Sequence, residues 1–258
     1  MIDDDPVEFL QRYKEQKNIE IAGFFASQFA YGKIDVFKKF LRMLFECMGD
    51  NPHAYIKKGN FSNLKGLYYR FQTSEDIVHL FHILKRILEE YDSIGNALRF
   101  FYRGDIRKAL WKLRGHLFGK ANELAFFFPK PSNTNPLKRW NLYLRWMVRK
   151  DGIDVGLWDF IDKSDLIIPL DTHLFKIGRC LGWVEKKTPS WKAACELTGV
   201  LKAISPEDPL RYDFFLCHKV GIGAKCTGRK TPQCKQLCIL YNDMENKEIL
   251  NSKPSSLH

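Results

Sequence analysis

The sequence predicts an all-α protein with about ten to twelve helices. Apolar residues recur every three or four positions along most of the chain, as they do in helices that bury one face. Residues that commonly begin helices precede several of these segments. Runs of alternating apolar and polar residues are scarce, and the one candidate strand, GLYYRF at 66–71, is short. We therefore expect helices in both halves of the chain.

Two segments in the first half show the helical period most clearly. Residues 35–48 place six apolar side chains on one broad face: Val36, Phe37, Phe40, Leu41, Leu44 and Met48. Residues 76–91 do the same with Ile77, Leu80, Phe81, Leu84, Ile87 and Leu88. The stretch Thr73-Ser74-Glu75-Asp76 precedes the second segment, and its composition is typical of a helix N-terminus.

The second half contains four further helical segments, which follow an irregular connection at 129–136. Asn135 is the expected cap of the first, Pro136 is its first residue, and it runs to about Lys150. Asp171 is the expected cap of a helix over 172–182, whose apolar stripe begins at Leu174. The last two segments, 190–204 and 210–220, each follow a capping residue and a proline, at Thr188-Pro189 and Asp208-Pro209.

Composition narrows the class of protein and of partner. The chain has 258 residues, 45% of them apolar, so it can bury a core as one domain or two. Its net charge of +11 suits a polyanionic partner such as nucleic acid, although charge alone is weak evidence. No apolar run approaches the roughly 18 residues that span a membrane. The acidic start MIDDDPVEFLQRYKEQ is unlike a signal peptide, and seven cysteines favour a reducing cytoplasm over a disulfide framework.

Lys138 and Asp171 each have a structural and a chemical interpretation. Lys138 lies in the first turn of its helix, where the helix dipole disfavours a cation. It is either one solvated lysine among many or a nucleophilic amine. Asp171 is a preferred helix cap, and a carboxylate in that position is also available for catalysis. The two interpretations of Asp171 are compatible.

The motifs around these two residues resemble those of the helix-hairpin-helix base-excision DNA glycosylase superfamily, which includes the endonuclease III and 8-oxoguanine glycosylase families. PLKRWNLYLRWMV matches the segment with the nucleophilic lysine at Lys138, and PLDTHLFKIGRCLG matches the segment with the catalytic aspartate at Asp171. The insert KDGIDVGLWDFIDKS makes their separation longer than usual, as in the archaeal-type 8-oxoguanine glycosylases. The chain also looks like an uncharacterised bacterial family that shares LRWMVRKD, PLDTH and YRF. The resemblance covers roughly residues 15 to 240.

The resemblance implies two helical lobes, with a helix-hairpin-helix and a cleft between the lobes. One lobe would comprise residues 24–150, the other 1–23 with 151–245, and 246–258 would be a disordered tail. The implied partner is duplex DNA that contains a damaged base, with no membrane and with the protein as a cytoplasmic monomer. The implied DNA-binding residues are Asn135, Arg139, His173, Lys176 and Arg179.

The resemblance also implies which residues contact the flipped base. Asp213 would accept hydrogen bonds from the purine, which suits an oxidised guanine. Cys217 takes the position of the expected stacking aromatic, so Phe214 is a further candidate. Gln28 would line the pocket or fill the space that the flipped base leaves. The alternatives are an Asp213 that only favours the helix dipole and a Gln28 that is simply buried.

The chain departs from the superfamily in two places. Its hairpin reads SNTNP, without the glycines that usually approach a phosphate. Endonuclease III-type enzymes carry a [4Fe–4S] loop of spacing C-x6-C-x2-C-x5-C, whereas this chain has Cys226-x7-Cys234-x3-Cys238 and no fourth cysteine after them. Cys217 precedes Cys226 by nine residues but lies on a predicted helix. We expect no cofactor, with a zinc ion at these three cysteines as the alternative.

The expected function is a DNA glycosylase with abasic-site lyase activity that excises 8-oxoguanine in base excision repair. Lys138 would form a Schiff base with the sugar, assisted by Asp171. A monofunctional glycosylase for alkylated bases would need Asp171 but not Lys138. A non-catalytic DNA-binding protein of the same fold is the third possibility.

Overall fold

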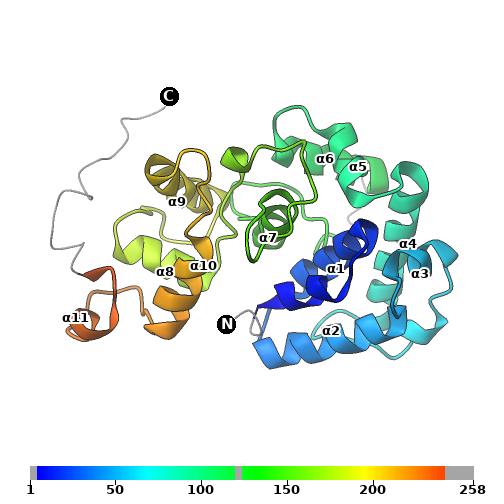
Figure 1. Cartoon of the computed structure of the whole chain (residues 1–258), viewed down its shortest axis with the longest axis horizontal. Coiled ribbons are helices and arrows are strands. Elements are labelled where there is room, and N and C mark those ends of the chain that lie inside the picture. Colours follow the sequence, from blue (N-terminus) through cyan, green and yellow to red (C-terminus); the bar gives the residue numbers. More distant parts are fainter. Residues whose placement is uncertain (1–4, 120–123, 242–258) are drawn as a thin grey trace. The chain divides into compact units, whose positions relative to one another are not determined.

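The computed structural model describes residues 5–119 and 124–241, and within these ranges the chain is all-α (Figure 1). Eleven α-helices, three 3-10 helices and one π-helix account for its regular structure. The described residues contain no strand, and only two isolated bridges occur, at Tyr69–Gln72 and Lys150–Val155. The candidate strand at 66–71 is therefore a tight turn, in which Arg70 has a φ of 57°. The predicted class is confirmed, and the predicted tail at 246–258 lies outside the described residues.

The chain divides into two compact units, Met1–Pro131 with Trp146–Ile161, and Ser132–Arg145 with Asp162–His258. The boundary falls inside helix α7 (Lys138–Val148), between Arg145 and Trp146. This division differs from the expected lobes in two places. Residues 1–23 belong with the first unit rather than the second, and 132–145 belong with the second rather than the first.

The first unit contains the helices of the N-terminal half. In chain order these are η2 (Pro6–Arg12), α1 (Gln16–Phe29), α2 (Ile34–Met48), α3 (Pro52–Lys58), η3 (Ser62–Leu64), α4 (Ser74–Tyr91), α5 (Ile94–Phe101) and α6 (Ile106–Phe118). Thr73 caps α4, and Asp76 closes the reciprocal capping box that the sequence predicted. α6 ends at Phe118, and the described residues 124–137 before α7 contain no helix, so the predicted hairpin at SNTNP does not directly follow one.

Helix α1 forms the core of the first unit, because its residues are buried on every side from Glu20 to Phe29. Phe25 stacks on Phe81 of α4 with ring centroids 4.7 Å apart. Each such phenylalanine contributes about 1.5–3 kcal/mol when it leaves water. The one buried acid of the helix, Glu20, accepts hydrogen bonds from the first backbone N–H groups of α5, at Ile94 (2.8 Å) and Gly95 (3.0 Å).

The second unit contains the first turns of α7 and the helices that follow. These are η4 (Lys163–Asp165), α8 (Thr172–Cys180), α9 (Trp191–Ile204), α10 (Asp213–Phe215), the π-helix η5 (Leu216–Gly223) and α11 (Cys234–Leu237). α8 packs against η5, and α10 runs directly into η5. The C-terminal π-helix therefore packs directly against the helix that Asp171 begins.

Three predicted helix starts in this unit are wrong by two to four residues. The side chain of Asn135 accepts the N–H of Leu137 at 2.9 Å in a local turn, and Leu137 has a φ of 53°, so α7 begins only at Lys138. Ser190, not Thr188, caps α9. After Asp208-Pro209 the backbone forms successive turns, and the helix starts at Asp213. Before α7 and α10, local turns satisfy the backbone ahead of the helix.

No helix among residues 5–119 and 124–241 combines the length and the apolar character that a bilayer crossing demands.

Candidate functional site

Lys138 begins α7 and shares a face of that helix with Arg145. A separation of seven residues corresponds to two helical turns, so the two side chains lie along one side. Lys138 is partly buried and Arg145 is buried. One face of α7 therefore presents two cations to the second unit.

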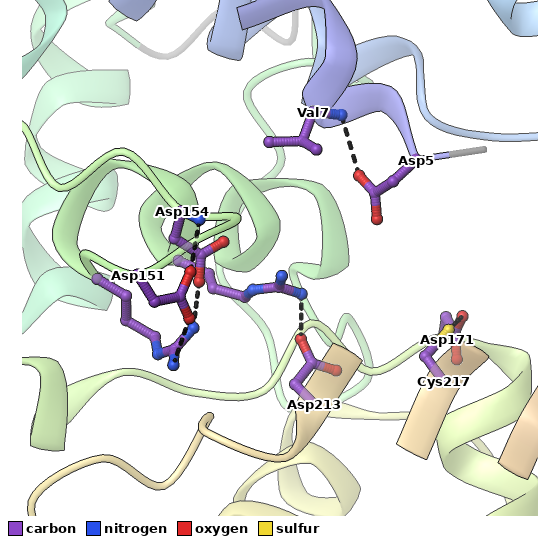
Figure 2. A network of polar contacts seen from close by, with 9 residues as sticks. Asp5, Val7, Asp151, Asp154, Asp171, Asp213 and Cys217 are labelled. Carbon is purple, nitrogen blue, oxygen red and sulfur yellow. Dashed lines mark hydrogen bonds and ion pairs between the residues drawn. The ribbon is translucent and has the colours of Figure 1, made fainter. Parts of the chain in front are cut away.

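Asp171 caps α8 as the sequence predicted. Its Oδ1 accepts the backbone N–H of Leu174 at 2.7 Å, and its own backbone is extended, as an N-cap requires. The second carboxylate oxygen, Oδ2, accepts a hydrogen bond from the Cys217 thiol at 3.4 Å (Figure 2). Both oxygens are thus held by groups from different elements, which fixes the orientation of the carboxylate.

The Cys217 thiol lies among the charged residues that the sequence singled out. Burial raises its pKa far above the ordinary value, and the negative charges of Asp171 and Asp213 raise it further. The positive charge of Lys138 acts on the same thiol in the opposite direction. Lys138 and Asp171, which are far apart in the sequence, therefore act on one sulfur atom. At neutral pH this sulfur is a thiol and not a thiolate.

Asp213 is bound to Arg145 in a buried ion pair. Its Oδ2 accepts a hydrogen bond from Arg145 Nη1 at 2.6 Å, and the two side chains are only 2% and 4% exposed (Figure 2). The carboxylate of Asp213 therefore compensates a buried guanidinium, a role that neither alternative for Asp213 included. Since Cys217 follows Asp213 by four residues, one helical turn connects this pair to the thiol beside Asp171.

Phe214, the candidate for stacking on the base, is itself stacked on His218. Their ring centroids are 4.1 Å apart and the rings are inclined by 22°. Phe214 and His218 are four residues apart and lie on a different side of the helix from Asp213. The thiol of Cys217 donates to Asp171 instead, so Cys217 helps to fix the orientation of this carboxylate.

The predicted DNA-binding residues have local roles in the structure. Arg179 donates hydrogen bonds to the carbonyl oxygens of Val184 (3.1 Å) and Glu185 (2.7 Å). His173 packs closely on η5. A β-carbon added at Gly221 would lie 2.7 Å from the Cβ of His173.

Lys176, Arg139 and Asn135 occupy less confined positions. Lys176 lies close to the backbone of Gly228. A β-carbon added at Gly228 would lie 3.0 Å from the Cβ of Lys176. Arg139 is partly buried in the first turn of α7, and Asn135 holds the turn before it.

Gln28 belongs to the first unit and is fully buried there. Its side-chain nitrogen donates to the hydroxyl of Ser27 at 3.4 Å. This environment is the one that the simpler alternative, a buried core glutamine, predicts.

The three C-terminal cysteines line one cavity together with a fourth, Cys180 from α8. Cys217, which the sequence offered as a doubtful fourth member, is not among the lining residues and contacts Asp171 instead. Within the described ranges, no group of three or more His, Cys, Asp or Glu side chains is arranged to hold a metal ion.

Sequence reasoning missed Arg145 and Cys180. Arg145 lies two turns after Lys138 on the side of α7 opposite the apolar stripe, and the sequence alone does not show that this side is also buried. Cys180 carries no motif of its own. Only the packing of α8 against the C-terminal segment brings it beside the other thiols.

Comparison with known proteins gives a family but no characterised relative. Neither a search of curated proteins nor a search of solved structures returned a match. Residues 5–222, which include Lys138, Asp171, Asp213 and Cys217, match the model of a family described as a protein of unknown function, DUF2400. The chain belongs to the DUF2400 family.

Proposed function

We propose that the chain is a DNA glycosylase with abasic-site lyase activity, and that its substrate is duplex DNA containing an oxidised guanine. The observation that carries the proposal is the arrangement around Cys217. The carboxylate of Asp171 accepts the hydrogen bond of this thiol, and the charge of Lys138 acts on the same thiol. These are the two residues whose motifs resemble the nucleophile and the catalytic aspartate of the helix-hairpin-helix glycosylases.

The proposed reaction uses the amine of Lys138 as the nucleophile. In its neutral form the amine attacks C1′ of the damaged nucleotide, the bond from C1′ to the base breaks, and the base leaves with the bonding electrons and then takes up a proton. Opening of the sugar ring gives a Schiff base between the lysine nitrogen and C1′. Loss of a proton from C2′ then expels the 3′ phosphate oxygen by β-elimination and nicks the strand.

The proposed role of Asp171 is electrostatic. Positive charge develops on the sugar as the base departs, and a fixed carboxylate stabilises it without having to reorganise. The N–H of Leu174 and the thiol of Cys217 hold the two oxygens from different sides. In this proposal Asp171 also accepts a proton from the lysine before attack.

Asp213 is the proposed base-recognition residue. The carboxylate of Asp213 is the predicted acceptor for the N1–H and amino groups of a flipped guanine derivative. Arg145 holds one oxygen of this carboxylate, which would fix its orientation toward a base. The basic surplus of the chain suits the phosphate backbone of the duplex.

Borohydride trapping on an oligonucleotide duplex with one 8-oxoguanine tests the proposal. We expect the wild-type protein to form a covalent adduct that Lys138→Gln abolishes and Asp171→Asn reduces by at least about a hundredfold. Lys150→Gln is the matched control, because Lys150 is an exposed lysine just after α7 and its loss removes the same charge. Base release that survives Lys138→Gln would favour the monofunctional alternative. Binding without adduct or base release, across a panel of lesions, would reject an enzyme.

A further inference from the structure

Helix α6 of the first unit exposes a basic face that contains a tryptophan. Its 13 residues, IRKALWKLRGHLF, include four lysines and arginines and no acidic residue. Lys108, Trp111 and Lys112 are exposed and recur at the spacing of one helical face. Lys130, from the segment after α6, places its ammonium group 5.3 Å from the centroid of the Trp111 ring. An exposed indole is therefore surrounded by lysines.

A group of aromatic side chains adjoins this face, because α5 and α6 pack together (Figure 1). Phe100 of α5 is 60% exposed, and Trp111 is 46% exposed. Phe101 lies between Phe100 and His116 of α6, with ring centroids 5.0 Å and 5.7 Å away. Exposed apolar side chains that gather in one place often mark a binding surface. We call the following residues the α6 surface: Phe100, Lys108, Trp111, Lys112, His116 and Lys130.

Gly115 leaves open space beside Trp111. It follows Trp111 by four residues, so the two positions are neighbours on the helix surface. A β-carbon added at Gly115 would meet nothing within 4 Å. Glycine is otherwise unfavourable inside a helix. Because no side chain covers this part of the helix, a planar ring can approach the indole from the side of Gly115.

The acids at the border of the α6 surface each have a cationic partner. Asp105, which caps α6, lies 3.3 Å from Lys108. Glu90 of α4 lies 2.5 Å from His116 and 2.7 Å from Arg86, and these two partners lower the pKa of its carboxyl group. These acids therefore compensate the positive charge only in part, and the surface favours a polyanionic ligand.

We propose that the α6 surface binds single-stranded nucleic acid, with an unpaired base stacked on Trp111 and the neighbouring phosphates held by its lysines. Stacking of one base on an aromatic side chain raises affinity roughly 5- to 150-fold. The exposed contact between Lys130 and the ring corresponds to only about two- to fivefold. A base therefore displaces the ammonium group, which then binds a phosphate. An acidic peptide would pair with the lysines but would not stack a ring on the indole.

Fluorescence anisotropy with the purified full-length chain and a labelled oligothymidylate of about 12 nucleotides tests this proposal. We expect Trp111→Ala to weaken binding at least about fivefold. Trp111→Phe keeps an aromatic face and should retain most of the affinity. Trp111→Leu keeps an apolar side chain without that face, so it should bind as weakly as Trp111→Ala.

The salt dependence of binding tests the role of the lysines. Each phosphate contact with a single strand contributes about 0.7 to the slope of log K against log salt concentration. Lys112→Gln should lower the slope by about this amount. Lys58→Gln is the matched control, because Lys58 is an exposed lysine of α3 in the same unit, and it should leave the slope unchanged.

This proposal is independent of the glycosylase proposal. The α6 surface belongs to the first unit, whereas Lys138 and Asp171 belong to the second. Trp111→Ala should therefore form as much borohydride adduct with the 8-oxoguanine duplex as the wild type. A chain that forms no adduct but binds oligothymidylate through Trp111 would contradict only the glycosylase proposal.

Several outcomes would overturn the proposed role of the α6 surface. It fails if the wild type does not bind oligothymidylate, or if Trp111→Ala or Trp111→Leu binds it as tightly as the wild type. It also fails if Trp111→Ala weakens binding of a duplex of the same length equally, because a duplex offers no unpaired base. Binding of oligoglutamate or of phosphatidylserine vesicles through Trp111, without binding of oligothymidylate, would assign the surface to an acidic peptide or a membrane instead. The Tm of each variant should stay within about 2 °C of the wild type, because the replaced side chains are exposed.

Discussion

The buried ion pair between Arg145 and Asp213 gives the sharpest stability prediction. Replacement of Arg145 by Met keeps the length of the side chain but removes the charge that compensates Asp213. The two side chains are 4% and 2% exposed, and their nitrogen and oxygen atoms are 2.6 Å apart. Water therefore does not reach the pair to replace the lost interaction.

Two estimates of the cost agree. Removal of one member of a buried ion pair costs about 3–5 kcal/mol of folding free energy. Alternatively, the carboxyl group of Asp213 can take up a proton, and protonation of an ordinary carboxyl group at pH 7 costs about 4 kcal/mol. The second value sets the upper limit. We expect Arg145→Met to lower the free energy of unfolding of the second unit by about 3–4 kcal/mol at pH 7. The loss should shrink as the pH is lowered, because protonation then becomes easier.

Urea unfolding at pH 7 and pH 5.5, followed by tryptophan fluorescence, measures this loss. Trp140 and Trp191 are residues of the second unit and report on it. Lys186→Met is the control, because it breaks an exposed pair of the same unit, with Glu196 at 3.6 Å, and should cost less than about 1 kcal/mol.

The double variant Arg145→Met, Asp213→Asn removes both charges and should recover most of the lost free energy. The reasoning is refuted if Arg145→Met is within about 1 kcal/mol of the wild type at pH 7. It is equally refuted if the double variant is as unstable as the sum of the two single variants.

Three further predictions follow from other sites. Burial raises the pKa of Glu20 above its ordinary value of 4.5, so the contribution of Glu20 to stability should fall as the pH rises above 4.5. The Tm of Glu20→Gln relative to the wild type should therefore rise with pH above 4.5, and parallel Tm profiles would contradict this. Asp171→Ala should cost about 1 kcal/mol in thermal unfolding and Asp171→Asn only a few tenths, while both lose adduct formation, which separates capping from catalysis. Gly221→Ala should cost about 1–3 kcal/mol through its clash with His173, whereas Gly199→Ala, where an added β-carbon meets nothing within 4 Å, should be neutral or stabilising in the same assay.

Periodicity predicted the helices, but it did not predict where they begin. The apolar stripes of 35–48 and 76–91 are buried as expected. A helix with one apolar face removes that face from water only by packing it against a core. The start of α9 depends on which of two hydroxyl residues, Thr188 or Ser190, caps the helix. The starts of α7 and α10 depend on competing turns around Leu137 and just before Asp213. Those turns are decided by local hydrogen bonds that capping statistics do not rank.

Contacts between side chains were harder to predict from the sequence than the helices that carry those side chains. The capping role of Asp171 is local and was predicted, since its partner Leu174 is three residues away. Its second partner, Cys217, is 46 residues away, and the pairing depends on how η5 packs against α8. Asp213 and Arg145 are 68 residues apart. A lone sequence contains no signal for contacts at these separations.

The C-terminal segment emerges as the element that positions the proposed catalytic helix. η5 contributes Cys217 to the carboxylate at the start of α8, and Gly221 of η5 contacts the first turn of that helix at His173. At the other end of α8, about 13 Å away by helix geometry, Cys180 lies with the cysteines of the following loop. Because both ends of α8 contact one continuous stretch of chain, a shift of that stretch would move Asp171.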